Sequence, residues 1–350
     1  MPDNFDFVQK VGGTSSGTGE LTFNAPHGLT TDGRFLWVCD TNNNRIKKLK
    51  LSGLSFVAHY GDVDVSTGLP TSGSGNTGFN KPEDIVYSAD HGLLFVSDLS
   101  NNRIKLHRAH DMAYVNEITG LSSPRGLAVN RQYLWCSDGG NSRIIRIKLS
   151  DLSIEQATGT NGSGNQQLET GARQIVYDAH ERVLYIADLS NLRVLKWDAF
   201  GLMIFRGKIT GLSSPYGLAY KDHILYVGDI AAASPIAAYA AATLALQEGA
   251  GTSGTGSGNT VVNTVGHILA YRNVIFFTDS GSHRLMCWQS YRSERALTAD
   301  SSQVIPGGGW FDSPISEIGD STTAIGADLI DRQRWVKSTG SGDSVAWVKT

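Results

Sequence analysis

The pattern of hydrophobic and polar positions repeats six times along residues 1–290. Each copy contains a short apolar run that ends in aspartate: "FLWVCD", "LLFVSD", "YLWCSD", "VLYIAD", "ILYVGD" and "VIFFTD". The six aspartates are 58, 40, 50, 41 and 50 residues apart, a mean near 48. A run that is apolar at nearly every position is typical of a strand covered on both faces. Six copies at this period indicate a repeat architecture.

Three further strands accompany each apolar run. A short first strand, such as "HGLTTD" or "RGLAVN", precedes it, and a third, such as "RIIRIKL", alternates polar and apolar residues as a half-buried strand does. A fourth, such as "AYVNEIT", completes the unit, and no segment has a convincing helical period. Four antiparallel strands in a unit of about 45 residues are typical of a propeller blade. We therefore predict an all-β, six-bladed β-propeller over residues 1–290.

Most of the apolar runs lead into an Asp-x-x-Asn-x-Arg turn. We expect the aspartate to accept backbone N–H groups, the asparagine to adopt the left-handed conformation, and the arginine to pair with the aspartate. This turn clasp is interpreted as structural. All six units keep the aspartate, but the fifth has Ser234 in place of the arginine. The predicted pairs are Asp40–Arg45, Asp98–Arg103, Asp138–Arg143, Asp188–Arg193 and Asp279–Arg284.

These motifs resemble the NHL-repeat family of propellers. The resemblance rests on the Pro-x-Gly-Leu opening, the V-x-D-x-x-N-x-R-I core and the Gly-rich bridge before the next proline, and it extends over residues 5–290. The opening is clean in units one, three and five, but reads "PEDI", "ARQI" and "GHIL" in units two, four and six. The resemblance implies a six-bladed ring. It also implies that lyase or lactonase chemistry with a metal is possible, since some NHL-like propellers have it.

The middle position of Pro-x-Gly is polar or ionisable in every unit that has a side chain there. We expect these residues to converge at one mouth of the central channel, as a small-molecule or ion site. Gly266 occupies the position in unit six, and His267 follows it, a shift of one residue that would turn it away from the axis. The predicted ring is His27, Glu83, Arg125, Arg173, Tyr216 and His267.

Three kinds of chemistry are open to this ring. His27, Glu83 and His267 come from neighbouring units and could meet as two imidazoles and a carboxylate, the ligand set of an open zinc or other divalent-metal site. Arg125 and Arg173 together suit an anion, and Tyr216 suits an acid or hydrogen-bond donor. The alternative is that a water-filled mouth is polar in any case and that its opposite charges balance. No nucleophile elbow, phosphate loop or HExxH motif indicates another enzyme class.

The two ends of the chain have different predicted roles. "FDFVQKVGG" near the N-terminus aligns with fourth strands, so we predict that it closes the ring as the outer strand of the last blade. Residues 291–350 match no blade and contain the near-duplicates "RWVKS" (334–338) and "AWVKT" (346–350), which predict a β-hairpin. We interpret residues 291–350 as a C-terminal extension for docking or assembly, since Trp310, Phe311, Trp335 and Trp347 need a surface to cover them.

Composition narrows the function classes. The net charge of −3 and the pI near 6.3 argue against nucleic-acid binding. The densest basic run, "RIKKLK" (45–50), is interpreted as an exposed strand face. Cys39, Cys136 and Cys287 have neither disulfide nor zinc spacing, so we expect buried thiols. No signal peptide and no membrane span are evident, which predicts a soluble protein of the cytoplasm or of a virion.

The leading hypothesis is a non-catalytic interaction or structural propeller without a cofactor, such as a subunit of a phage virion or tail. It would bind protein partners or further copies of itself through the loop face and residues 291–350. One alternative is a metal-dependent lyase or lactonase-type hydrolase at the channel. The other is a carbohydrate- or peptide-binding module.

Overall fold

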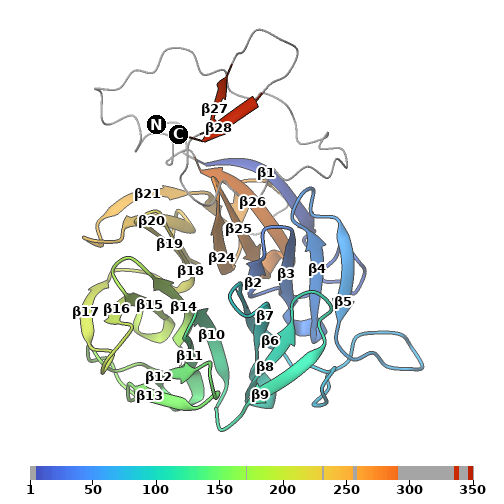
Figure 1. Cartoon of the computed structure of the whole chain (residues 1–350), viewed down its shortest axis with the longest axis horizontal. Coiled ribbons are helices and arrows are strands. Elements are labelled where there is room, and N and C mark those ends of the chain that lie inside the picture. The colour runs from blue at the N-terminus through green and yellow to red at the C-terminus, as the bar shows by residue number, and fades with distance from the viewer. Residues whose placement is uncertain are drawn as a thin grey trace. The chain divides into compact units, whose positions relative to one another are not determined.

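The computed structural model describes residues 5–170, 172–230, 232–254, 258–290, 335–338 and 346–349. The chain divides into two compact units, residues 1–302 and residues 303–350, and each is described by itself. The first unit is a ring of six four-stranded antiparallel sheets around a central axis (Figure 1). The prediction of a six-bladed β-propeller is therefore confirmed.

Each blade runs from an inner strand to an outer one. Blade 1 contains β2 (Leu29–Thr31), β3 (Phe35–Asp40), β4 (Arg45–Lys50) and β5 (Phe56–Tyr60). Blade 2 contains β6 (Pro82–Ser88), β7 (Leu93–Asp98), β8 (Arg103–Arg108) and β9 (Tyr114–Ile118). Blade 3 contains β10 (Pro124–Val129), β11 (Tyr133–Asp138), β12 (Arg143–Lys148) and β13 (Ile154–Thr158).

The other three blades follow the same plan. Blade 4 contains β14 (Ala172–Asp178), β15 (Val183–Asp188), β16 (Arg193–Asp198) and β17 (Phe205–Ile209). Blade 5 contains β18 (Pro215–Lys221), β19 (Ile224–Asp229), β20 (Ile236–Ala240) and β21 (Leu246–Ala250). Blade 6 contains β24 (Val265–Tyr271), β25 (Val274–Asp279), β26 (Arg284–Ser290) and the N-terminal β1 (Phe5–Gly12). A short parallel pair, β22 (Thr252–Ser253) and β23 (Val261–Val262), lies in the connection from blade 5 to blade 6.

The N-terminal strand closes the ring, as the sequence predicts. β1 pairs antiparallel with β26, from Phe5 opposite Ser290 to Gly12 opposite Arg284. Figure 1 shows the two strands side by side although they come from opposite ends of the ring's sequence. This pairing satisfies the edge of β26 that would otherwise be open to association.

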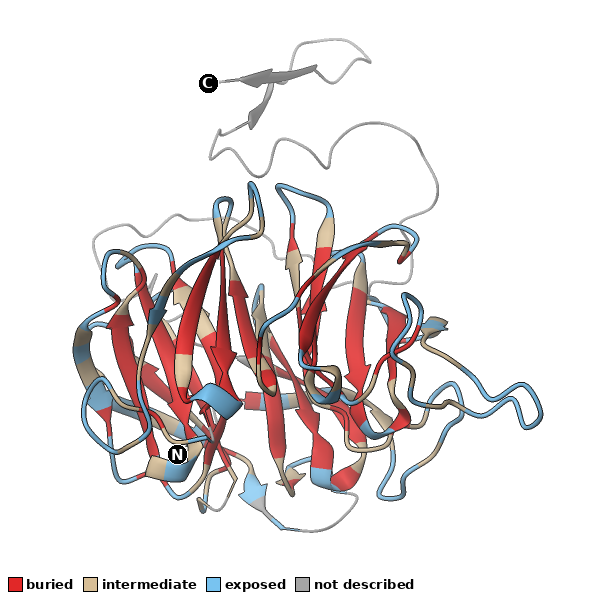
Figure 2. Cartoon of the chain, turned by 90° about the horizontal axis from the view of Figure 1, so that it is seen from below, coloured by how far each residue is buried: buried red, intermediate tan, exposed pale blue. Residues whose placement is uncertain are grey.

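The hydrophobic core lies between adjacent blades. Large aromatic side chains of the second strands stack on tyrosines of the next blade's inner strand: Trp37 on Tyr87, Trp135 on Tyr177, and Tyr185 on Tyr220. Figure 2 shows that the inner parts of the sheets are buried and that exposed residues concentrate at the loops. The three cysteines are free and buried, as expected. Because the apolar second strands are covered on both faces, the blades need no helices to bury them.

One expectation about the surface is wrong. The run "RIKKLK" is not an exposed strand face, because Lys47 and Lys48 are 0% and 4% exposed. The Lys48 ammonium lies 4.2 Å from the ring centre of Phe35 and donates to the carbonyl oxygen of Ala109 in the next blade. The third strand of blade 1 is thus covered by its neighbours, which periodicity alone does not reveal.

The second unit contains two described strands. β27 (Trp335–Ser338) pairs antiparallel with β28 (Ala346–Lys349), with Trp335 opposite Lys349 and Ser338 opposite Ala346. The predicted pairing of the two near-duplicate segments is therefore present. Trp310 and Phe311 lie outside the described residues. Within the ranges that the structure describes, no helix is long and apolar enough to cross a membrane.

Candidate functional site at the channel mouth

A register irregularity at the start of five of the six inner strands shapes the channel mouth. In β6 and β24 it falls within Pro82–Asp84 and Val265–His267, and equivalent shifts occur in β10, β14 and β18. In a regular strand, successive side chains point to opposite faces, but an irregularity of this kind re-aims one of them. Two consecutive positions of each opening can therefore contribute to the axis, one at the mouth and one deeper in the channel.

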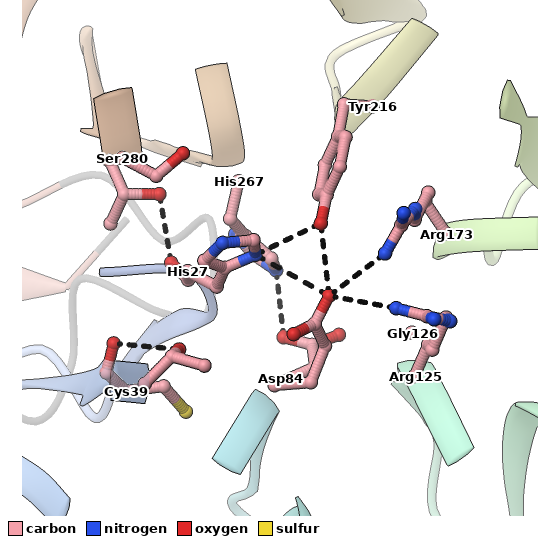
Figure 3. A network of polar contacts seen from close by, with 12 residues as sticks. His27, Cys39, Asp84, Arg125, Gly126, Arg173, Tyr216, His267 and Ser280 are labelled. Atoms are coloured by element: carbon pink, nitrogen blue, oxygen red, sulfur yellow. Dashed lines mark hydrogen bonds and ion pairs between the residues drawn. The ribbon is translucent and has the colours of Figure 1, made fainter. Parts of the chain in front are cut away.

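Glu83 occupies the centre of the outer layer. Four blades direct donors at its Oε1 atom: the Tyr216 hydroxyl at 3.0 Å, and His27 Nδ1, Arg125 Nη1 and Arg173 Nη1 at 3.4 Å each. Figure 3 shows these four side chains converging on one carboxylate oxygen. Five of the six predicted ring residues are thus in one polar network.

The network sets the ionisation of its members. Burial acts to raise the pKa of Glu83, but His27 and then the Arg125 and Arg173 guanidiniums hold that pKa well below its ordinary value. Burial and the Glu83 charge raise the pKa of Tyr216 well above its ordinary value. Glu83 is therefore an anion and Tyr216 a neutral hydrogen-bond donor at neutral pH.

His267 belongs to a second, deeper layer with Asp84 and Gln174. Its Nε2 atom lies 3.0 Å from Asp84 Oδ1 and also contacts the Gln174 amide. Blades 1, 3 and 5 have Gly28, Gly126 and Gly217 at this position, in the order Gly, Asp, Gly, Gln, Gly, His around the ring. A Cβ atom on Gly126 would lie 2.2 Å from the Arg173 carbonyl oxygen, so the glycine allows adjacent inner strands to approach.

This second layer corrects the metal hypothesis. His267 was expected either to join His27 and Glu83 or to point away from the axis, and it does neither. In the part of the chain that the structure describes, no three His, Cys, Asp or Glu side chains are placed to hold a metal ion together. The reason is the strand-start irregularity, which places His267 one layer below His27 and against Asp84.

Below the second layer the channel becomes apolar. A cavity of about 220 Å³ opens beyond Gln174 and His267. Side chains of the inner strands line it, among them Val86, Ala128, Val176, Ala219 and Leu269. The charged side chains that line the channel are thus at one end, which we call the mouth, while the cavity below is lined by apolar side chains together with Thr30 and three tyrosines.

The predicted turn clasps surround this mouth. In all five pairs the arginine Nε donates to the aspartate Oδ2 over 2.7–2.9 Å. Each turn is a short 3-10 segment: η1 (Thr41–Asn43), η2 (Leu99–Asn101), η3 (Gly139–Asn141), η4 (Leu189–Asn191) and η5 (Ser280–Ser282). In blade 5, where Ser234 replaces the arginine, Asp229 accepts the backbone N–H groups of Ser213 and Ser214.

The asparagine of the Asp-x-x-Asn-x-Arg motif does not adopt the left-handed conformation that the sequence analysis expects. The left-handed residue is the next one along, for example Asn44 with φ 53° and Asn102 with φ 55°. The motif residues Asn43 and Asn101 instead donate from Nδ2 to the clasp aspartates, at 2.9 and 2.8 Å. The same amides reach the carbonyl oxygens of the segments that lead into the blades. The asparagine therefore links the turn to that segment.

Four clasp arginines also hold the long bridges between blades. We define the first bridge as residues 13–25 and the second bridge as residues 61–81. Arg45 donates to the Thr18 carbonyl oxygen at 2.7 Å and Arg103 to that of Gly75 at 3.1 Å. Arg193 and Arg284 do the same for the bridges into blades 4 and 6, through Ser163 and Gly258. These contacts place bridges and clasps together on the mouth face.

Two buried lysines add to this anchoring, and the sequence interpretation missed them. Lys105 Nζ donates to the carbonyl oxygens of Asn76 and Gly78 at 2.7 and 2.9 Å and lies 4.2 Å from the ring centre of Phe79. Lys47 occupies the same position in blade 1, against the first bridge and Phe23. Burial lowers the pKa of each lysine to about 8. A sequence signal for these lysines does exist. Only units one and two have both Phe-Asn just before the first strand and Arg-Ile-Lys at the start of the third strand.

Comparison with known proteins agrees with this fold. The family model described as NHL repeat matches residues 23–49. The match and the six blades confirm the resemblance inferred from the sequence: the chain is a six-bladed β-propeller with an NHL repeat. No curated protein matches the sequence.

Three solved structures share the propeller architecture. A chain of the mitotic checkpoint complex has 12% identity and a TM-score of 0.56, over 83% of this chain and 96% of that one. A Bacteroides thetaiotaomicron protein of unknown function has 14% identity and a TM-score of 0.57, over 81% of this chain and 76% of that one. A catalytically inactive virginiamycin B lyase from Staphylococcus aureus with quinupristin has 13% identity and a TM-score of 0.53, over 79% of this chain and 82% of that one. At these identities the likeness concerns the fold alone.

Proposed function

We propose that the chain is a non-catalytic interaction scaffold that associates through the loops of its mouth face. The second bridge carries this proposal, because it is held firmly and yet presents apolar side chains to solvent. Val65 is 99% exposed, and Leu69 and Val63 are 50% and 45% exposed. Figure 1 shows the connection between β5 and β6 projecting beyond the ring.

The second bridge is internally organised rather than loosely attached. Asp64 Oδ1 accepts the backbone N–H groups of Ser66 and Thr67 at 3.0 and 2.8 Å. Asp62 Oδ1 accepts the Thr77 hydroxyl at 2.7 Å, and Val63 forms a β-bridge with Pro70. A preorganised loop loses little conformational entropy on binding, so the exposed apolar side chains are well placed to contribute to an interface.

The energetic argument favours a covered state for these side chains. Burying a valine or leucine side chain fully stabilises by roughly 1.5–3 kcal/mol relative to leaving it in water. Single exposed apolar residues are ordinary, but three on one projecting bridge form a candidate contact surface. The partner that we propose is a further copy of the chain, in keeping with a subunit of a larger assembly such as a phage virion or tail.

Self-association of the full-length chain tests this function. The variant carries Val65→Asp and Leu69→Asp. The matched control is Leu202→Asp, since Leu202 is 71% exposed but lies in the connection between β16 and β17 of blade 4, away from the second bridge in the sequence. We expect the particle mass of the unaltered chain, measured by light scattering, to rise with concentration, and the double variant to stay monomeric. The control should behave like the unaltered chain.

Truncation after Ser290 separates the two proposed contact regions. If residues 291–350 also contribute to assembly, the truncated ring should remain folded but associate more weakly than the full chain. A full-length chain that stays monomeric at high concentration would contradict the proposed assembly. An equal mass for the double variant and the full chain would exclude the second bridge as the contact.

A further inference from the structure

The outer layer of the channel mouth contains more positive than negative charge. Two guanidiniums, from Arg125 on β10 and Arg173 on β14, face the single carboxylate of Glu83. Figure 3 shows the two arginines side by side on the same flank of that carboxylate. Both contacts go to the same atom, Oε1, at 3.4 Å, so neither arginine forms the two-point pairing that a guanidinium prefers.

Both guanidiniums retain donors that the described protein groups do not use. An arginine has five N–H donors, and within the described residues each of these two makes hydrogen bonds only from Nη1. The Nε atoms of Arg125 and Arg173 are buried without a hydrogen-bond partner in that part of the chain. The side chains are 18% and 21% exposed, so part of each remains open at the mouth.

The deeper layer contains a second carboxylate, that of Asp84, but this carboxylate does not pair with Arg125 or Arg173. The carboxylate of Asp84 is engaged by His267 Nε2 at 3.0 Å and by the backbone N–H groups of Ile85 and Leu127, both at 2.8 Å. Burial and the neighbouring Arg173 charge lower the pKa of Arg125, as expected for a guanidinium that lacks an anion of its own. The mouth therefore has a deficit of negative charge at Arg125 and Arg173.

The guanidiniums are also held in position before any ligand arrives. The Arg173 guanidinium carbon lies 4.6 Å from the ring centre of Tyr216, and the Tyr216 hydroxyl is fixed by Glu83 and by His27 Nδ1 at 3.1 Å. Gly139 leaves room for Arg125, because a Cβ atom there would lie 3.1 Å from Arg125 Nε. A preorganised pair of guanidiniums suits a planar or tetrahedral oxyanion.

We propose that the mouth binds a small oxyanion, of the carboxylate or phosphate type, on the solvent-open side of Arg125 and Arg173, because the space that the mouth residues enclose is only about 10 Å³ and holds no more than a water molecule. Glu83 holds the two guanidiniums together at the axis, and the oxyanion takes the donors that Glu83 leaves free. Because Glu83 is an anion itself, it opposes the incoming ligand and limits the affinity. This site is independent of the second bridge, so either proposal can fail while the other stands.

Titration calorimetry with sodium phosphate and with sodium acetate at constant ionic strength tests the site. We expect saturable binding of at least one of the two, and the preferred anion identifies the oxyanion class. Glu83→Gln keeps an acceptor for Tyr216 and removes the opposing charge, so it should tighten binding by about tenfold, a typical effect of one nearby charge. Arg125→Gln and Arg173→Gln should each weaken binding by about tenfold or more.

Two controls keep the test decisive. Arg206→Gln removes an exposed arginine on the outer strand β17, where it pairs with Asp198, and should leave anion binding unchanged. Melting curves confirm that each variant is folded before its titration is interpreted. The proposal is overturned if neither anion binds saturably to the unaltered chain or to Glu83→Gln. It is equally overturned if binding is the same in Arg125→Gln and Arg173→Gln as in the unaltered chain.

Discussion

Blades 2 and 3 have the same turn clasp, but the clasp arginine has different surroundings in each. In blade 2, Arg103 is 9% exposed at its side chain and bonds to Asp98, to Glu117 and to carbonyl oxygens of the second bridge. In blade 3, entered by the short "TGLSSP" segment, Arg143 is 31% exposed and, within the described residues, bonds to Asp138 alone. The same motif therefore performs two tasks in blade 2 and one in blade 3.

Blade 5 extends the comparison. It is also entered by a short segment, and it has Ser234 where the arginine would be. Asp229 still closes its turn by accepting backbone N–H groups of that segment. The aspartate is thus sufficient to join a short bridge to the turn, whereas a long bridge requires the arginine as a second point of attachment.

The largest effect should come from removing the closing strand. Deletion of residues 1–12 takes β1 away from β26 and leaves blade 6 incomplete in a ring whose core lies between blades. We expect loss of soluble, cooperative folding, measured by circular dichroism and thermal melting. Closure by β1 would be unnecessary for stability if the truncated chain melted at the same temperature as the full one.

Removal of the clasp arginine should separate blades 2 and 3. Arg103→Ala leaves the fully buried Asp98 without its charge partner, which typically costs about 3–5 kcal/mol of unfolding free energy. Arg143→Ala also leaves a buried aspartate, Asp138, but Arg143 is 31% exposed and has no bridge contact among the described residues, so its loss should cost less than that of Arg103 by about 1 kcal/mol or more, the net value of the bridge hydrogen bonds. Denaturant unfolding of both variants measures the difference. Equal costs would mean that the bridge contacts of Arg103 add nothing.

The buried lysines should give a smaller, pH-dependent effect. The pKa of Lys105 is about 8 in the folded chain, against about 10.4 for an unperturbed lysine. Above pH 8 the unfolded chain binds more protons at this position, so the unfolding free energy should rise with pH between about 8 and 9.5. The contribution is lost as pH falls through 8.

The matched variants for this effect are Lys105→Met and the exposed-lysine variant Lys208→Met. Lys105→Met should reduce the rise in unfolding free energy between about pH 8 and 9.5 without abolishing it, because methionine does not titrate whereas Lys47, whose pKa is also about 8, still does. Lys208→Met should leave the rise unchanged, because the ammonium of this exposed lysine hydrogen-bonds only to Asn165 Oδ1 within the described residues. A slope that is unchanged in Lys105→Met would assign the rise to groups other than Lys105.

Much of the ring could be predicted from the sequence because its determinants are local. An apolar run that ends in aspartate defines a strand and the start of its turn without knowledge of distant residues, and it recurs six times, four of them with the full Asp-x-x-Asn-x-Arg motif. The convergence of Glu83, Arg125 and Tyr216 also followed from the repeat, since equivalent positions in a ring share one radius and height.

The remaining features depend on contacts that periodicity does not encode. The sequence predicts an exposed face for Lys47. The alternation of polar and apolar residues in its strand does not reveal that the first bridge covers this lysine. His267 was placed in the wrong layer because a strand-start irregularity breaks the two-residue alternation. The left-handed residue was placed one position early, at Asn43 rather than Asn44, since both are asparagines and only the backbone distinguishes them.

The central claim is that each long bridge of the mouth face is held in place by the clasp arginine of the blade it enters. Amide hydrogen exchange on Arg103→Ala and Arg143→Ala tests it most directly, with Gly73 N–H, bonded to the Phe79 carbonyl oxygen at 2.9 Å, as the reporter for the second bridge. We expect Gly73 to lose protection in Arg103→Ala, while Gly140 N–H, bonded to the Ser122 carbonyl oxygen at 2.8 Å, stays protected in Arg143→Ala. Unchanged protection at Gly73 in a folded Arg103→Ala chain would contradict the claim.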